Sequence, residues 1–252
     1  PYHWFYMEWI KKAKEKQVLY IHFTMDDNPS LSQSVKDRYK SLYSGAFYER
    51  FIEGKWVTAQ GLVYPMFSPE RHIKKCKGKF NRFYLSCDYG TVNPFSLGLW
   101  GECDGKWFRL DEYYYSGRDN GIQLTDEEYY RELEKLAENR EITALIIDPS
   151  AASFIQTVLR HGEFRVVKAN NDVLTGINRV CQALKDEEIF IYPACTDAIR
   201  EFSIYRWDDN IKKDAVKKEN DHAMDDIRYF VATVLGRENQ NSAFASVAIE
   251  RN

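Results

Sequence analysis

The sequence predicts an α/β protein with a mixed sheet, in which three antiparallel strands come first and parallel strands alternating with helices follow. Three short runs rich in aromatic and β-branched residues, at 82–88, 95–101 and 106–115, have connections so short that we expect an antiparallel meander. From residue 125 onward, short apolar runs alternate with segments of helical period. That alternation is typical of parallel strands joined by helical crossovers.

The elements after the meander follow in a regular order. A helix begins at Thr125, which can form a capping box with Glu128. Segment 205–219 has a turn at Asp209-Asn210 and is predicted to be a basic hairpin. The expected elements are a helix to about 139, a strand at 144–147, a helix after Ser150, a strand at 164–168, a helix at 173–184, a strand at 189–192, a helix at 196–204 and a last helix at about 221–236.

Two of the predicted strands end in the same way. The run 83–87 leads into Asp88 and Tyr89-Gly90, and the apolar run 144–147 leads into Asp148. If the two strands are parallel neighbours, the spacing of a sheet brings the aspartates to within about 5 Å at the backbone. Carboxylates that close repel each other unless a cation lies between them, so the pair indicates a divalent metal site. Either aspartate taken singly is also compatible with a turn-forming cap.

The last helix carries a third candidate carboxylate. Asp225 lies on the face nearly opposite the apolar stripe of this helix, and Asp221, His222 and Tyr229 are its neighbours on that face. Taken alone, this pattern indicates a solvent-facing surface, and Asp221 is equally compatible with a helix cap. Residues 238–252 are polar and small, and they are predicted to be a tail.

The composition excludes several classes of protein. A hydrophobic content of 44% and an aromatic content of 15% fit a globular core rather than a disordered chain. No run approaches the roughly 20 apolar residues of a membrane span, and no signal peptide is evident, so we expect a soluble, intracellular protein that does not bind membranes. The five cysteines include no C-x-x-C pair, which indicates reduced thiols and argues against a zinc site.

The charge is unevenly distributed. The net charge of −3 argues against a nucleic-acid binder, but residues 1–80 carry 14 Lys and Arg against 8 Asp and Glu. A basic run at 71–82 and the hairpin could contact phosphates or could simply be solvated. The basic hairpin residues are Arg206, Lys212, Lys213, Lys217 and Lys218.

Three motifs together make the prediction specific. They are Cys87-Asp88-Tyr89-Gly90, Ile146-Ile147-Asp148-Pro149-Ser150, and Asn220-Asp221-His222-Ala223-Met224-Asp225-Asp226-Ile227-Arg228-Tyr229. The set closely resembles the nuclease domain of bacteriophage terminase large subunits, which has the ribonuclease H-like fold. Segments 23–29 and 51–57 also resemble the end of that family's ATPase domain and its linker. The resemblance therefore implies an ATPase-domain remnant and linker at 1–78, a nuclease domain at 79–237 and the tail at 238–252.

The resemblance also implies a function. Asp88, Asp148 and Asp225 would hold two divalent ions, Mg²⁺ or Mn²⁺, with His222 as an auxiliary catalytic residue. The protein would then be an endonuclease that cuts concatemeric double-stranded DNA during packaging. Its partners would be DNA, the capsid portal and the terminase small subunit, and it would act in the host cytoplasm. Asp226 departs from the alanine expected at its position and points about 100° away from Asp225, so we do not assign it to the site.

Other interpretations remain open from the residues. No Gly-x-x-x-x-Gly-Lys-Ser/Thr motif occurs, so this chain cannot supply a Walker loop. A transposase or junction resolvase would share the fold. Asp88-Tyr89-Gly90-Thr91 resembles the first phosphate loop of actin-like ATP binders, although Asp148-Pro149-Ser150 does not match their second loop. A non-catalytic module that binds the portal or DNA is the remaining alternative.

Overall fold

The computed structural model describes residues 3–43, 45–57, 59–208, 210 and 214–236, and these form two compact units. The first unit contains the described residues up to Pro65 together with those of Tyr205–Lys218. The second contains Met66–Ile204 together with the described residues from Glu219 onward.

The second unit is built on a six-stranded mixed sheet with the strand order β5-β4-β1-β2-β3-β6. The pairs β1–β2 and β2–β3 are antiparallel, whereas β1–β4, β4–β5 and β3–β6 are parallel. The predicted meander followed by parallel strands is therefore confirmed. The strands are β1 (Arg82–Asp88), β2 (Phe95–Cys103), β3 (Lys106–Tyr115), β4 (Ile142–Ile147), β5 (Val166–Lys168) and β6 (Ile189–Ile191).

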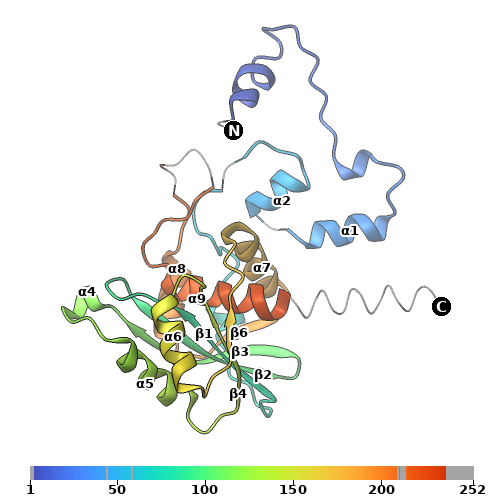
Figure 1. The fold of residues 1–252 in the computed structure, drawn as a ribbon. Coiled ribbons are helices and arrows are strands. Elements are labelled where there is room, and N and C mark those ends of the chain that lie inside the picture. Colours follow the sequence, from blue (N-terminus) through green and yellow to red (C-terminus); the bar gives the residue numbers. More distant parts are fainter. Residues whose placement is uncertain (1–2, 44, 58, 209, 211–213, 237–252) are drawn as a thin grey trace. The chain divides into compact units, whose positions relative to one another are not determined.

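Helices cover both faces of this sheet (Figure 1). Leu85 of β1 shares a buried apolar cluster with Leu133 and Phe154, which belong to two helices on one face. Its neighbour Tyr84 points to the other face, as alternation along a strand requires, and contacts Phe230 of the last helix. The helices are α3 (Pro69–His72), α4 (Gly117–Asn120), α5 (Asp126–Ala137), α6 (Ala152–His161), α7 (Val173–Lys185), α8 (Thr196–Ile204) and α9 (His222–Phe230), which continues as the π-helix η3 (Val231–Leu235).

Burial of α9 differs from what the helical wheel suggests. The sequence predicts that the face of Asp225 is solvent-exposed, but the exposed fraction of this residue is only 7% because α7 and α8 pack against α9. Every residue of the helix after His222 is buried. An apolar stripe shows which face meets the sheet, and it carries no information about neighbours on the opposite face.

The first unit consists of short helices and a hairpin. Arg50 forms an ion pair with Asp214, and Trp207 bridges to Val216 across the predicted hairpin. The turn residue Asp209 and the basic residues Lys212 and Lys213 lie outside the described residues. The helices are η1 (Tyr6–Ile10), η2 (Met25–Asp27), α1 (Gln33–Ser41) and α2 (Gly45–Phe51).

One cysteine pair contradicts the expectation of reduced thiols. Cys76 and Cys103 form a disulfide that joins the segment before β1 to the end of β2. The two residues are 27 positions apart in the sequence, and only the fold brings them together. Among the described helices, none combines the length and apolar character needed to cross a membrane.

Candidate metal centre

The pairing of β1 with β4 places two of the predicted ligands at one edge of the sheet. Cys87 is in register with Ile147, so Asp88, the last residue of β1, and Asp148, the first residue after β4, follow side by side. Asp225 lies in the first turn of α9, which packs on β1 and β4. Carboxylates from two strands and a helix therefore approach the carboxyl edge of the parallel strands.

Asp88 is held by two side chains of α9. His222 Nδ1 lies 2.8 Å from Oδ2 of Asp88, and the Tyr229 hydroxyl makes a long contact of 3.5 Å to Oδ1. Burial raises the pKa of Asp88 to about 6, even though the hydrogen bond from His222 opposes the rise, and the charge of Asp225 adds to it. Burial lowers the pKa of His222, but the hydrogen bond and charge of Asp88, with the charges of Asp221 and Glu201, outweigh burial and raise the pKa. Asp88 is thus a carboxylate whose negative charge the fold does not fully compensate.

Asp148 has different surroundings. Its Oδ1 accepts a hydrogen bond from the Ser150 backbone at 2.7 Å, and its Oδ2 accepts one from Asn171 at 3.3 Å. Burial raises the pKa of Asp148, but hydrogen bonds from Ser150, Tyr229 and Asn171 outweigh that effect and lower it below the usual range. Asp148 is therefore kept in its charged form.

Asp225 pairs with a buried cation. Both Nη2 and Nε of Arg228 donate to Oδ1 of Asp225, at 2.8 and 3.2 Å. The Arg228 side chain is 2% exposed, and its Nη1 donates to the backbone carbonyl of Asn171 at 2.9 Å. It passes over Gly176 of α7, where a Cβ atom would approach Arg228 Cγ to 2.6 Å. Asn171 thereby links the surroundings of Asp148 and Asp225.

No role in the site was predicted from the sequence for Arg228, Tyr229 or Asn171. The spacing of Asp225 and Arg228 on one helix is a recognisable ion-pair signal, and Tyr229 was noted only as a neighbour on that face. Asn171 lies in a loop and carries no such signal. The Tyr229 pKa is raised, first by burial and then by the charges of Asp88, Asp225 and Asp148, so its hydroxyl remains a neutral donor among all three carboxylates.

The carboxylate oxygens have the chemistry of a site for Mg²⁺ or Mn²⁺, but the three carboxylates do not lie close enough together to contact a single ion. Within the described part of the chain, the one group of three His, Cys, Asp or Glu ligand atoms that all lie within 4.8 Å of one another is Cys76, Cys103 and Asp104, and its sulfurs are bonded to each other. The three aspartates are more widely spaced, and each contacts a different neighbour: His222, Ser150 or Arg228. Carboxylates that share two ions need not all reach one ion.

The predicted DNA-binding residues lie in the other unit. Arg206 bridges to Leu62, and the Lys217 backbone donates to the Arg206 carbonyl at 3.1 Å. Lys218 is exposed, while Lys212 and Lys213 are outside the described residues. Their contact with DNA stays a prediction.

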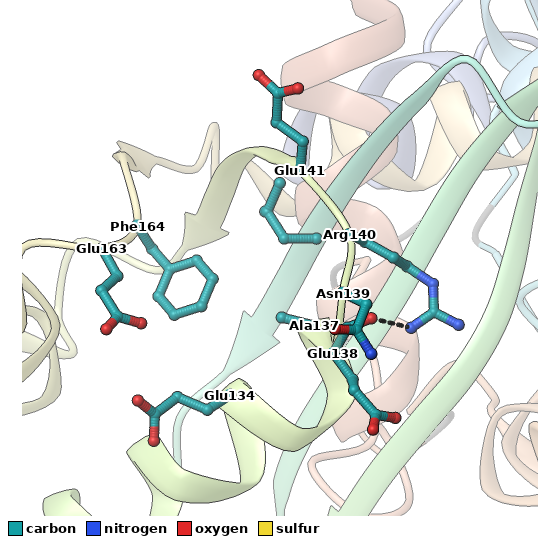
Figure 2. A pocket seen from close by; sticks show the side chains of 9 residues that line it. Glu134, Ala137, Glu138, Asn139, Arg140, Glu141, Glu163 and Phe164 are labelled. Atoms are coloured by element: carbon teal, nitrogen blue, oxygen red, sulfur yellow. Dashed lines mark hydrogen bonds between the residues drawn. The ribbon is translucent and has the colours of Figure 1, made fainter.

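A separate pocket lies at the opposite end of β4 (Figure 2). It is lined by Ile142, the first residue of β4, whereas Asp148 follows the last one, so about 20 Å of strand separates them. Four glutamates and one arginine line it, so its net charge is negative and disfavours a phosphate. We assign it no part in the candidate metal centre.

The strand order and the mixed pairing define the fold: the second unit has a ribonuclease H-like fold, which it shares with solved terminase nuclease domains. The particular relationship is to the bacteriophage terminase large subunits, as the three motifs predicted. No protein-family model matches the chain.

Two comparisons support this relationship, and a third shows the shared fold. A large terminase from a thermophilic bacteriophage, solved in complex with ADP, is 46% identical with a TM-score of 0.83 over 93% of this chain and 60% of that chain. The terminase large subunit of Escherichia phage T5 is 20% identical over 229 residues, which are 85% of this chain and 51% of that protein. The large terminase nuclease of thermophilic phage G20c, solved with bound magnesium, shares the fold at 9% identity and a TM-score of 0.52, over 68% of this chain and 97% of that chain. This chain thus spans about half to three fifths of the length of its full-length relatives.

Proposed function

We propose that this chain is the nuclease part of a terminase large subunit and cuts concatemeric double-stranded DNA during viral genome packaging. The observation that carries the proposal is the approach of Asp88, Asp148 and Asp225 to one edge of the sheet from two parallel strands and α9. The similarity to the ADP-bound large terminase supports the same assignment. The activity is that of a metal-dependent endonuclease.

The three aspartates would hold two divalent ions, Mg²⁺ or Mn²⁺. Such ions activate a water molecule and stabilise the leaving oxygen of a phosphodiester. The magnesium in the G20c nuclease supports this choice of metal. In this chain, Asp148 is kept charged by its donors, and Asp88 is largely charged above pH 6 and gains most from a cation. His222, which holds a proton toward Asp88, orients that carboxylate.

The remaining parts of the chain have proposed roles that follow from the family. Residues 1–78 would be the end of an ATPase domain with its linker, and 79–237 the nuclease domain. The hairpin residues Arg206, Lys217 and Lys218 would contact the phosphate backbone of double-stranded DNA. The capsid portal and the terminase small subunit would be the protein partners.

Plasmid cleavage tests the proposal. We expect supercoiled plasmid to be nicked and linearised by the chain in Mg²⁺ or Mn²⁺, and to stay intact in EDTA. Asp148→Asn should abolish cleavage, while Asp111→Asn, an exposed aspartate on β3, should retain it. No metal-dependent cleavage by the wild-type chain, or a strong preference for four-way junctions over linear duplex, would overturn the assignment to packaging.

A further inference from the structure

A buried carboxylate that the sequence did not single out lies beside the first turn of α9. Glu201 of α8 is fully buried, and its Oε2 accepts hydrogen bonds from the backbone N–H groups of Ala223 at 2.8 Å and Met224 at 3.3 Å. The first N–H groups of a helix have no partners within the helix, and they favour a negative charge. The side chain of Asp221, at the N-cap position, makes no capping hydrogen bond. Glu201 therefore caps α9 from a neighbouring helix.

The other oxygen of Glu201 is held in place from the sheet. Tyr114 of β3 donates to Oε1 at 2.7 Å, and Arg200 contributes a longer contact of 3.4 Å. Burial raises the pKa of Glu201 to about 6, despite the lowering effect of these donors. A buried acid with four donors around it is tightly fixed, because moving it would leave several polar groups unpaired.

The helix that carries Glu201 is anchored in the same manner. Glu112 accepts hydrogen bonds from the backbone N–H groups of Asp197 at 2.7 Å and Ala198 at 3.3 Å, at the start of α8. Glu112 also pairs with Arg109, which is wholly buried and donates to Asp226 at 2.7 Å. The chain of contacts thus runs from α9 through β3 to α8 and returns to α9 at Glu201. Asp226 belongs to this chain of contacts and also accepts hydrogen bonds from the hydroxyl groups of Ser86 and Ser96.

The position of Glu201 matters because of what the first turn of α9 carries. Ala223 and Met224 stand between His222, which contacts Asp88, and Asp225. A fraying or rotation of this turn would move both side chains away from Asp88. The Asp225 N–H already donates to the Asp221 carbonyl at 2.7 Å, so the Glu201 contacts fix the two donors immediately before it.

We propose that Glu201 is a positioning residue for the metal centre: by capping α9, it holds His222 and Asp225 toward Asp88. The inference rests on the proposed function, because it assigns a consequence for metal binding and cleavage. Glu201 does not touch DNA or metal in this account.

Two substitutions separate the hydrogen bonds of Glu201 from its charge. Glu201→Ala removes the cap. We expect kcat for plasmid nicking, or the apparent Mn²⁺ affinity, to fall about 10- to 100-fold, as for other residues that support metal ligands. The KM for DNA should stay within about twofold of the wild-type value. Glu201→Gln retains an oxygen for the Ala223 N–H and should restore most of the activity. Leu133→Ala, on the buried side of α5, is the control for general destabilisation and should keep wild-type kcat below its melting temperature.

Hydrogen exchange gives a readout that does not depend on cleavage. The amides of Ala223 and Met224 should lose protection in Glu201→Ala and keep it in Leu133→Ala. If Glu201→Ala does not fold, Tyr114→Phe removes one donor to Glu201 and should lower kcat about two- to fivefold.

The outcomes distinguish the two proposals. The positioning role is overturned if Glu201→Ala keeps wild-type kcat and Mn²⁺ affinity. The same holds for Tyr114→Phe where that variant has to be used. Losses of equal size in Leu133→Ala would also overturn it. If the wild-type chain neither binds Mn²⁺ nor cuts DNA, the proposed function fails. The capping contact is tested separately: it is absent if the amides of Ala223 and Met224 exchange at the same rate in Glu201→Ala and in the wild type.

Discussion

The Nδ1 atom of His222 lies 2.8 Å from Oδ2 of Asp88, so the first residue of α9 is hydrogen-bonded to the last residue of β1 across 134 positions of sequence. This contact joins the helix to the acidic edge of the sheet without a metal ion. The same helix brings Asp225 and Tyr229 close enough to affect the pKa of Asp88 or to contact it directly. The position of α9 therefore controls the candidate metal centre.

Replacing Asp88 should have opposite effects on activity and on stability. We expect Asp88→Asn to abolish plasmid cleavage, since it removes one of the three carboxylates that would hold the ions. In EDTA the fold binds the Asp88 proton more tightly than the unfolded chain, so the charged form costs stability above pH 6 and costs nothing below pH 3.8. Asp88→Asn should then raise the free energy of unfolding at pH 8 by up to about 3 kcal/mol.

Chemical denaturation in EDTA at pH 8 and pH 3 checks this expectation. The stabilising effect of Asp88→Asn should be present at the higher pH and disappear at the lower one. A variant that is less stable than the wild type at pH 8 would show that the fold compensates the Asp88 charge.

Arg228 is expected to act as the cation for Asp225 when metal is absent. Arg228→Met keeps much of the side-chain volume but leaves Asp225 buried beside no guanidinium, so the metal-free protein should lose about 3 kcal/mol. Because Mn²⁺ can replace the missing charge, it should raise the melting temperature of the variant more than that of the wild type.

Thermal unfolding with and without Mn²⁺ measures that difference. Arg160→Met, an exposed arginine on α6, is the control and should respond to Mn²⁺ like the wild type. Equal stabilisation of Arg228→Met and the wild type by Mn²⁺ would mean that Asp225 is not a ligand.

The raised pKa of Glu201 predicts a pH-dependent stability. The folded state binds the Glu201 proton more tightly than the unfolded state, so stability falls as the pH rises from 4.5 through about 6. Glu201→Gln lacks this group. The stability of the wild type relative to Glu201→Gln should therefore decrease by about 2 kcal/mol between pH 4.5 and pH 7.

Glu128 provides a control of opposite sign. Hydrogen bonds from the Thr125 backbone and side chain lower the pKa of Glu128, so its contribution is lost as the pH falls. The stability of the wild type relative to Glu128→Gln should accordingly increase with pH. The Glu128 contribution is lost below pH 4.5, so denaturation curves at pH 3, 4.5, 5.5 and 7 measure both pairs. Parallel trends for the two variants would contradict the prediction for Glu201.

The hairpin lysines should affect DNA binding through charge alone. Each phosphate contact contributes about 0.9 to the slope of log K against log salt, so Lys217→Ala with Lys218→Ala should lower the slope by up to about 2. The loss should be similar for any duplex sequence. Fluorescence anisotropy over a salt series measures the slope, with Lys135→Ala on α5 as the control. An unchanged slope would remove the hairpin from the DNA interface.

The sequence was sufficient to predict the sheet and its acidic edge, because strands have a short, local signature. Asp88 and Asp148 each end an apolar run, and parallel pairing of those runs follows from the alternation with helices. The helical spacing placed Asp225 opposite the apolar stripe, and the resemblance to terminase nuclease domains assigned it to the site. None of these inferences needed knowledge of what packs on the outer side of α9.

The contacts that support the site could not be predicted, because they come from tertiary packing. Nothing in the sequence distinguishes Glu201 and Asp226 from ordinary helical acids, yet both are fully buried against partners from other elements. Asn171 belongs to a loop whose course no periodicity reveals. The Cys76–Cys103 disulfide has the same cause, since β2 and the segment before β1 meet only in the folded chain.

The most direct test of the account is a crystal of the chain soaked in Mn²⁺ and measured by anomalous scattering. We expect two Mn²⁺ peaks about 3.5–4 Å apart, bound by oxygen atoms of Asp88, Asp148 and Asp225. Manganese bound elsewhere, or its absence from these three carboxylates at a concentration that supports plasmid cleavage, would contradict the account.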